Sequence, residues 1–205
     1  MKRLLPAIGI VAIGLAIILV FRRPIGPAVN PDPNHTHADF RVMLDGTQVD
    51  FTDEAFQTGA STEDHTRDPA LSPLRKFLHL HDGLGHVIHR HKPGLTLQDF
   101  FDSIAVGFTA NCIAYRAPVD RDMACSDNDW RMVVNGQERP FSLNYEFVDG
   151  DRILLTTASD DAVMEAEWAA MTDDSCLYSR TCPWRGDPPE ENCIADPEVP
   201  CVVIE

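Results

Sequence analysis

Short stretches of the chain alternate between apolar and polar residues, which is the pattern of β-strands with one buried face. Residues 40–44 alternate in this way and are separated from Val49 and Phe51 by Asp45 and Gly46. An Asp-Gly pair between two such stretches is typical of a tight hairpin turn. The same pattern predicts two further hairpins and a late strand, over residues 76–91, 131–141 and 152–157.

Two other stretches carry apolar residues at helical spacing. The first follows Thr96, a favourable N-cap, and has Asp99 at the position of the acid in a capping box. The second covers residues 160–171, with Ser159 as its expected cap. Hairpins around one central packing helix, followed by a late strand, predict an α+β domain with a mixed, β-grasp-like sheet. We expect loops over residues 58–73 and 110–128.

The two ends of the chain depart from this pattern. Residues 4–21 are apolar and uncharged, and a helix of that length rises about 27 Å, close to the thickness of a bilayer core. We therefore expect residues 1–23 to form a transmembrane anchor, although a signal peptide cleaved near Gly26 or Ala28 also fits. The remaining segments are a stiff proline-rich linker, the domain itself and a cysteine-containing tail, at residues 24–34, 35–171 and 172–205.

Cysteine usage and charge narrow the compartment and the partners. The six cysteines all lie between Cys112 and Cys201 and include no CxxC pair. Disulfides formed outside the cytoplasm are the simplest explanation of such a set. Basic residues lie on both sides of the anchor, so charge does not decide its orientation. The inference that the domain lies outside the cytoplasm therefore depends on the cysteines. A net charge of -15 excludes nucleic acid as a partner, because no basic surface is left to neutralise phosphates.

Five of the eight histidines fall within the predicted hairpin of residues 76–91. Residues 82–85 predict a type I turn in which Gly85 is left-handed, which gives a three-residue loop. In that register His79 lies opposite His89 and His81 opposite Val87. One face of the hairpin then carries Leu78, Leu80 and Ile88, and the other carries His79, His81, His89 and His91.

Imidazoles on adjacent strands are close enough to bind one metal ion. His79, His81 and His89 are the central candidates, and neutral imidazole suits copper and zinc. Competing interpretations of the same face are a solvated polar surface and a pH-responsive surface.

A second pair of histidines, His35 and His37, opens the first predicted strand. If that strand lies beside the hairpin, His37 and Asp39 face away from the core and can add a ligand or an orienting group. We expect His65 and His86 to be exposed to solvent.

Most of the chain after the linker resembles an uncharacterised family of membrane-anchored, extracytoplasmic bacterial and archaeal proteins. The matching stretches are HTHADFRVMLDG, HLHDGLGHVIHRH, LTLQDFFDSI, VVNGQERP, DGDRILL and CLYSRTCPWRGDPPEENC, with the pair Cys112 and Cys125 between them. The resemblance implies an architecture and no particular activity. The family pattern has a turn one residue shorter and Glu at the position of His91, so it favours His91 least among the four candidates.

We expect Cys112 and Cys125 to form one disulfide, worth about 3 kcal/mol by loop closure. Four cysteines remain and allow three pairings, namely Cys176, Cys182, Cys193 and Cys201. The leading hypothesis is a membrane-anchored extracytoplasmic protein that binds copper or zinc through its histidine hairpin. The alternative is a non-catalytic accessory subunit of a larger membrane protein complex. A metalloenzyme would also need a general base and a pocket, and the sequence indicates neither.

Overall fold

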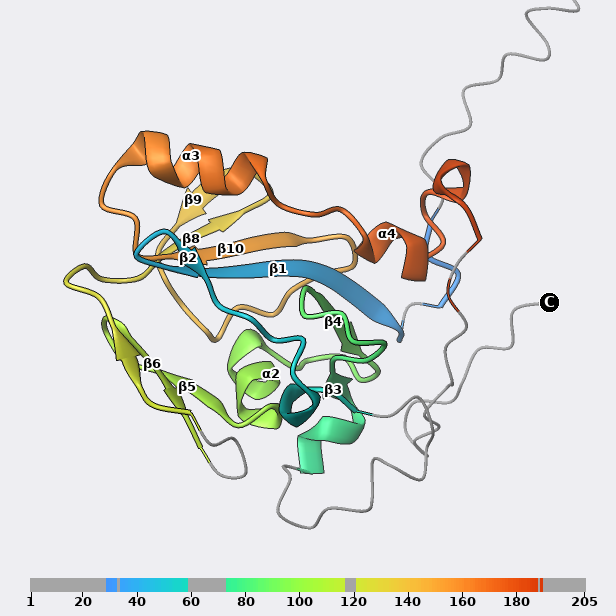
Figure 1. Ribbon diagram of the computed structural model, residues 1–205. Helices are drawn as coiled ribbons and strands as arrows, with labels where there is room; N and C mark the ends of the chain where they lie inside the picture. The colour runs from blue at the N-terminus through green and yellow to red at the C-terminus, as the bar shows by residue number, and fades with distance from the viewer. Residues whose placement is uncertain (1–28, 33, 59–72, 117–120, 188, 190–205) are drawn as a thin grey trace, which may run out of the picture.

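The computed structural model describes residues 29–32, 34–58, 73–116, 121–187 and 189, and the structural statements below concern these residues. They form two β-sheets and three α-helices, which confirms the predicted α+β class (Figure 1). Within this described part, no helix is both long and apolar enough to cross a bilayer. Several predictions lie outside the described residues: the anchor, most of the loop 58–73, His65, and the cysteines Cys193 and Cys201.

The main sheet has its longest strand at the centre. β1 (Thr36–Leu44) runs parallel to β10 (Arg152–Thr156), and the other pairs in this sheet are antiparallel. The strand order is β3-β4-β1-β10-β8-β9, and β2 shares the β4 side of β1. The other strands of this sheet are β2 (Thr47–Gln48), β3 (Leu78–His79), β4 (Val87–Arg90), β8 (Arg131–Val134) and β9 (Gln137–Arg139).

Two of the predicted hairpin turns have the expected conformation. Asp45 and Gly46, between β1 and β2, have φ of 49° and 74°. Asn135 and Gly136, between β8 and β9, have φ of 51° and 77°. Positive φ at both central residues defines the type I′ turn, whose twist matches that of paired strands. The sequence therefore predicts these hairpins correctly.

Helix α2 (Leu97–Ser103) covers one face of the main sheet (Figure 1). It begins with the predicted capping box, in which the Thr96 hydroxyl accepts from the Asp99 amide and the Asp99 carboxylate accepts from the Thr96 amide at 2.8 Å. Phe100 of α2 packs edge-on against Phe40 of β1, with ring centroids 5.1 Å apart. Because side chains alternate along β1, the residues on either side of Phe40 point to the opposite face.

Helix α3 (Asp161–Ala169) lies over that opposite face, beyond β10 (Figure 1). The helix is predicted correctly, but its cap is Asp160 and not Ser159, since the Asp160 carboxylate accepts from the amides of Ala162 and Val163. Its residues Met164 and Trp168, together with Met171 just after the helix, pack on the sheet residues Met43, Val133 and Leu154.

The predicted loop over residues 110–128 is only partly correct. It contains two short strands of a second sheet, in which β6 (Cys112–Tyr115) pairs with β5 (Val106–Phe108) and β7 (Ala124–Cys125). These strands are too short to show alternation, and Ile113 is buried in the core by tertiary packing. The predicted disulfide Cys112–Cys125 is confirmed and joins two residues that are paired across β6 and β7. Three 3-10 helices complete the structure: η1 (Glu54–Phe56), η3 (Pro73–Lys76) and η4 (Pro183–Arg185).

Candidate metal-binding site

Histidines from three adjacent strands lie together on the face of the main sheet that α2 does not cover. His37 of β1 is paired with His89 of β4, which is paired with His79 of β3. The ring centroids of His37 and His89 are 4.9 Å apart, and those of His81 and His89 are 3.8 Å apart. Five members of the group are buried and His35 is half-buried; the group consists of His35, His37, His79, His81, His89 and His91.

The predicted division of the hairpin into two faces is confirmed. Leu78, Leu80 and Ile88 are buried in the core cluster that contains α2. The predicted pairing of His79 with His89 is also correct, and β1 does lie beside the hairpin. The histidine face predicted from alternation is therefore present, although it is buried and not a solvated surface.

The predicted turn of this hairpin is wrong. Asp82 and Gly83 have positive φ, 61° and 69°, and the Leu84 amide donates to the His81 carbonyl at 3.1 Å, so these residues form a two-residue turn of the I′ kind. Gly85 does not take the left-handed conformation. It is needed for another reason, because a Cβ there would lie 2.8 Å from the backbone of Phe51 and Thr52.

With this turn, β3 and β4 pair only at Leu78 with Arg90 and at His79 with His89. β3 ends at His79, and Leu80 instead forms a parallel bridge with Gln57. The predicted pairing of His81 with Val87 is therefore wrong. His81 nevertheless reaches the cluster, since its ring lies against that of His89.

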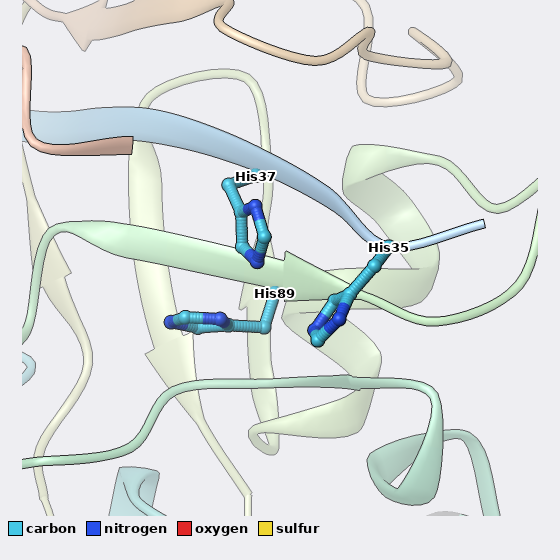
Figure 2. A group of neighbouring side chains, drawn as sticks. All are labelled: His35, His37 and His89. Carbon is cyan, nitrogen blue, oxygen red and sulfur yellow. The ribbon is translucent and has the colours of Figure 1, made fainter. Parts of the chain in front are cut away.

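Three of the histidines converge closely enough to share one ion. Each of His35, His37 and His89 offers a ring nitrogen, and these nitrogens all lie within 4.8 Å of one another. Figure 2 shows the three rings gathered around a common space, with His37 on β1, His89 on β4 and His35 just before β1. His35 joins this group although the hairpin alone suggested a centre at His79, His81 and His89.

A second close approach joins the other side of the cluster. The Nε2 atoms of His79 and His91 lie 3.3 Å apart, and both side chains are buried. The ring of His91 also lies against that of His35, with centroids 4.0 Å apart. The two groups of rings are thus continuous.

A chain of hydrogen bonds fixes the ring of His37. Its Nδ1 lies 2.8 Å from the Ser179 hydroxyl, and that hydroxyl donates to the Asp149 carboxylate at 2.5 Å. A hydroxyl has one hydrogen, and a carboxylate can only accept. Nδ1 of His37 must therefore donate to Ser179, which leaves the lone pair of the neutral ring on Nε2.

The rings of His79 and His81 are fixed in the same sense. Nδ1 of His79 lies 3.1 Å from the carbonyl oxygen of Arg75, and Nδ1 of His81 lies 2.8 Å from the Asp82 carboxylate. Both partners only accept, so both Nδ1 atoms carry hydrogen and the lone pair of each ring, when neutral, is on Nε2. A carbonyl or carboxylate behind the second ring nitrogen is the arrangement that orients metal-bound histidines.

The tail covers the histidine cluster. Helix α4 (Ser175–Tyr178) contacts β1, and the Tyr178 ring stands edge-on to that of His89, with centroids 4.7 Å apart. Asp39, fully buried on β1, accepts from the Thr172 hydroxyl at 2.6 Å and from the amides of Asp174 and Ser175 at 2.9 and 2.8 Å. A buried carboxylate at the start of α4 thus attaches the tail to the sheet.

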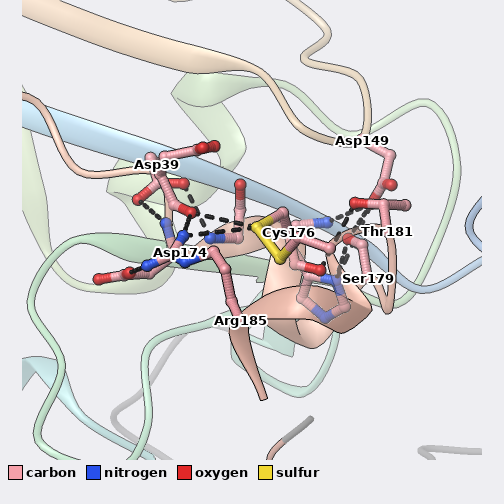
Figure 3. Close-up of a disulfide and its surroundings, with 11 residues drawn as sticks. Asp39, Asp149, Asp174, Cys176, Ser179, Thr181 and Arg185 are labelled. Atoms are coloured by element: carbon pink, nitrogen blue, oxygen red, sulfur yellow. Dashed lines mark hydrogen bonds and ion pairs between the residues drawn. A yellow bond between two sulfur atoms is a disulfide. The ribbon is translucent and has the colours of Figure 1, made fainter. Parts of the chain in front are cut away.

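The disulfide Cys176–Cys182 closes this attached segment into a loop (Figure 3). It resolves one of the pairings that the sequence left open. The loop contains both Tyr178 and Ser179, the two tail residues that touch the cluster. Figure 3 shows Asp39 and Asp174 on one side of the disulfide and Asp149 and Ser179 on the other.

His86 is not the exposed residue that the sequence predicts. It is half-buried, and its Nε2 lies 2.9 Å from the Asp174 carboxylate, which also accepts from Arg185 at 2.6 Å. Burial raises the pKa of Asp174, but the hydrogen bonds from Arg185 and His86 outweigh it and lower the pKa overall. This group therefore serves to hold the tail in place.

Asp39, His86 and Asp174 also offer three ligand atoms within 4.8 Å of one another. The oxygens of Asp39 already accept three hydrogen bonds from the tail, and His86 is bonded to Asp174. These contacts account for the group without a metal ion.

Sequence reasoning missed the tail residues and Asp149. The stretch from Cys176 to Cys182 has a spacing that suits a closed loop, which was the available signal, but nothing in it indicates which surface it covers. Asp149 belongs to the turn before β10 and reads as an ordinary turn residue. Comparison of the chain with protein-family models, with curated proteins and with solved structures finds no match.

Proposed function

We propose that this protein binds a transition metal ion through its buried histidine cluster. The observation that carries the proposal is the orientation of His37, His79 and His81, each of which has Nδ1 held by an acceptor and its lone pair on Nε2. A solvated polar face needs no such support behind its rings. A metal site does, because the second hydrogen bond fixes both tautomer and ring direction.

The donor set favours copper or zinc. The cluster offers imidazole nitrogens alone, without a thiolate or a carboxylate among its six members. Imidazole suits borderline ions such as zinc and copper, whereas magnesium and calcium require oxygen ligands.

We propose that the domain works outside the cytoplasm on a single N-terminal membrane anchor. The two disulfides among the described residues support an oxidising compartment. The apolar stretch 4–21 supports the anchor on sequence grounds alone. Membership of the uncharacterised extracytoplasmic family, and a role as accessory subunit of a membrane complex, stay predictions.

We also propose that the domain is β-grasp-like. The parallel pair β1 and β10 at the centre, antiparallel strands on both sides and α2 on one face support this assignment. The assignment concerns architecture, and the function is argued from the site.

The proposal is tested by calorimetric titration of the full-length chain, purified in mild detergent and stripped with a chelator, against zinc and against copper. We expect saturable binding of at least one of the two ions at neutral pH, weakened at least tenfold in His37→Gln. Glu165→Gln is the matched control, because Glu165 is exposed on α3 and is not a member of the cluster. Absence of uptake of both ions by the wild-type chain would overturn the proposal.

A further inference from the structure

We propose that the cluster holds two metal ions at separate positions, one at His35, His37 and His89 and the other at His79 and His91. This inference rests on the proposed function. It goes beyond it by assigning the number of ions and dividing the histidines between them.

The six histidines do not fit around one ion. Ligands bound at 2.0–2.1 Å can lie at most about 4.2 Å apart, on opposite sides of the metal. Among the described residues, the histidine group whose ring nitrogens all lie within 4.8 Å of one another is His35, His37 and His89. His79 and His91 are therefore outside the first position.

The distance between His79 and His91 fits two ligands on one tetrahedral ion, as well as a hydrogen bond between their Nε2 atoms. With metal–nitrogen bonds of about 2.05 Å, a separation of 3.3 Å between the two Nε2 atoms corresponds to a bond angle of about 107°, near the tetrahedral value. Two nitrogens on opposite sides of a linear ion would lie about 4.1 Å apart by the same bond length. The pair is thus bent, as for a four-coordinate ion that keeps further positions for other ligands.

The tautomer of His79 agrees with this assignment. The Arg75 carbonyl holds Nδ1 of His79, so its lone pair is on the Nε2 that faces His91. The competing explanation is a hydrogen bond from a protonated Nε2 of His91 to His79. The two explanations differ in the number of ions that the protein takes up.

The two positions are adjacent but unequal. The ring centroids of His35 and His91, one from each position, lie 4.0 Å apart. The ring of His81 lies 3.8 Å from that of His89 and 5.6 Å from that of His79 by centroids. The position with three converging histidines should bind more tightly than the position with two. We expect a chelator to remove the ion at His79 and His91 first.

The number of ions is measured by elemental analysis of the full-length chain after equilibration with zinc and removal of unbound metal. We expect two ions per wild-type chain, one in His91→Gln, one in His37→Gln and two in Glu165→Gln, whose substituted residue is exposed on α3. Retention of one ion by each single variant also shows that the variant is folded.

The outcomes separate this inference from the proposed function. One ion per wild-type chain overturns the second position and leaves metal binding intact, whereas no ion overturns both. Two ions in the wild-type chain that persist in His91→Gln and His37→Gln would place the ions elsewhere and overturn the assignment. Loss of both ions from His91→Gln, with an unfolding midpoint equal to wild type, would show one shared site and overturn it as well.

Discussion

Nδ1 of His37 lies 2.8 Å from the hydroxyl oxygen of Ser179, which is 142 positions further along the chain. The first residue belongs to the central strand and the second to the disulfide-closed tail. Since the Ser179 hydroxyl donates onward to Asp149, it accepts from His37 and sets the tautomer of that ring. The tail therefore fixes which nitrogen of His37 carries the hydrogen, in addition to covering the cluster.

Substitution Ser179→Ala removes this acceptor and should weaken metal binding by roughly 10- to 100-fold, the usual effect of losing a hydrogen bond behind a ligand histidine. Calorimetric titration with zinc measures the change. Ser159→Ala is the matched control, since Ser159 is exposed, lies just before α3 and is not a member of the cluster. Equal affinities for the two variants would contradict the role assigned to Ser179.

Asp39→Asn should release the tail. The buried carboxylate accepts three hydrogen bonds from tail residues, and an amide in its place would turn its own hydrogens toward some of those donors. We expect a loss of about 2–4 kcal/mol in the free energy of unfolding. Hydrogen exchange should also accelerate at the Ser175 amide.

The control for this loss is Asp187→Asn, an exposed acid in the same tail, which should change stability by less than about 0.5 kcal/mol. If Asp39→Asn keeps the Ser175 amide as protected as in the wild-type chain, Asp39 is not what attaches the tail.

The histidine face was predictable because it depends on local alternation. Leu78, Leu80 and Ile88 define the buried side of the hairpin, and the register follows from keeping them together. The turn was not predictable in the same way. Gly85 is required by the approach of the Phe51 backbone, a tertiary contact that the turn sequence does not reveal.

The residues that contact the hairpin histidines from other parts of the chain were harder to predict from the sequence. His35 converges with His37 and His89 because β1 pairs with β4. The sequence did not show whether these two strands are neighbours. Tyr178 and Ser179 come from a segment without periodicity, so their position depends on the buried Asp39 and on a disulfide whose pairing the sequence leaves open.

Two glycines of the histidine hairpin should respond differently to alanine. In Gly85→Ala the new Cβ would overlap the backbone of Phe51 and Thr52 at 2.8 Å, so these two backbone segments must move apart. We expect a loss of about 3 kcal/mol, at the upper end for overpacking. In Gly83→Ala the Cβ meets no atom within 4 Å, and the cost is that of a positive φ of 69°, about 1 kcal/mol.

Chemical denaturation of the two variants measures both values. An equal loss in Gly83→Ala and Gly85→Ala would mean that Gly85 is needed for conformation and not for the close approach.

The phenol of Tyr145 should titrate unusually late. Partial burial, and then its hydrogen bond to the buried Asp151, raise the pKa of Tyr145 from 10.0 to about 12. Because the folded chain holds this proton more tightly than the unfolded chain, the stabilisation is complete below pH 10.0 and is lost as the pH rises toward 12.

Ultraviolet titration of phenolate should therefore show a step near pH 12 that is absent from Tyr145→Phe. The difference in stability between wild type and this variant should shrink over the same interval. A tyrosine step lost near pH 10.0 instead would show that Asp151 does not hold the proton.

Removal of each disulfide should separate stability from metal binding. Cys112 and Cys125 are 13 positions apart, and opening that loop by the double serine variant should cost about 3 kcal/mol. Cys176 and Cys182 are 6 positions apart, so opening their loop should cost less, about 2 kcal/mol.

Metal affinity should change in the opposite order. The first disulfide lies in the second sheet, whereas the second closes the loop that carries Tyr178 and Ser179 onto the cluster.

We therefore expect the double variant Cys176→Ser with Cys182→Ser to lower zinc affinity at least tenfold. The double variant Cys112→Ser with Cys125→Ser should leave zinc affinity within a factor of two. Both are measured by calorimetry well below their unfolding temperatures. An equal fall in affinity in the two variants would mean that metal binding follows global stability. In that event the tail would be a cover for the cluster, without a part in orienting His37.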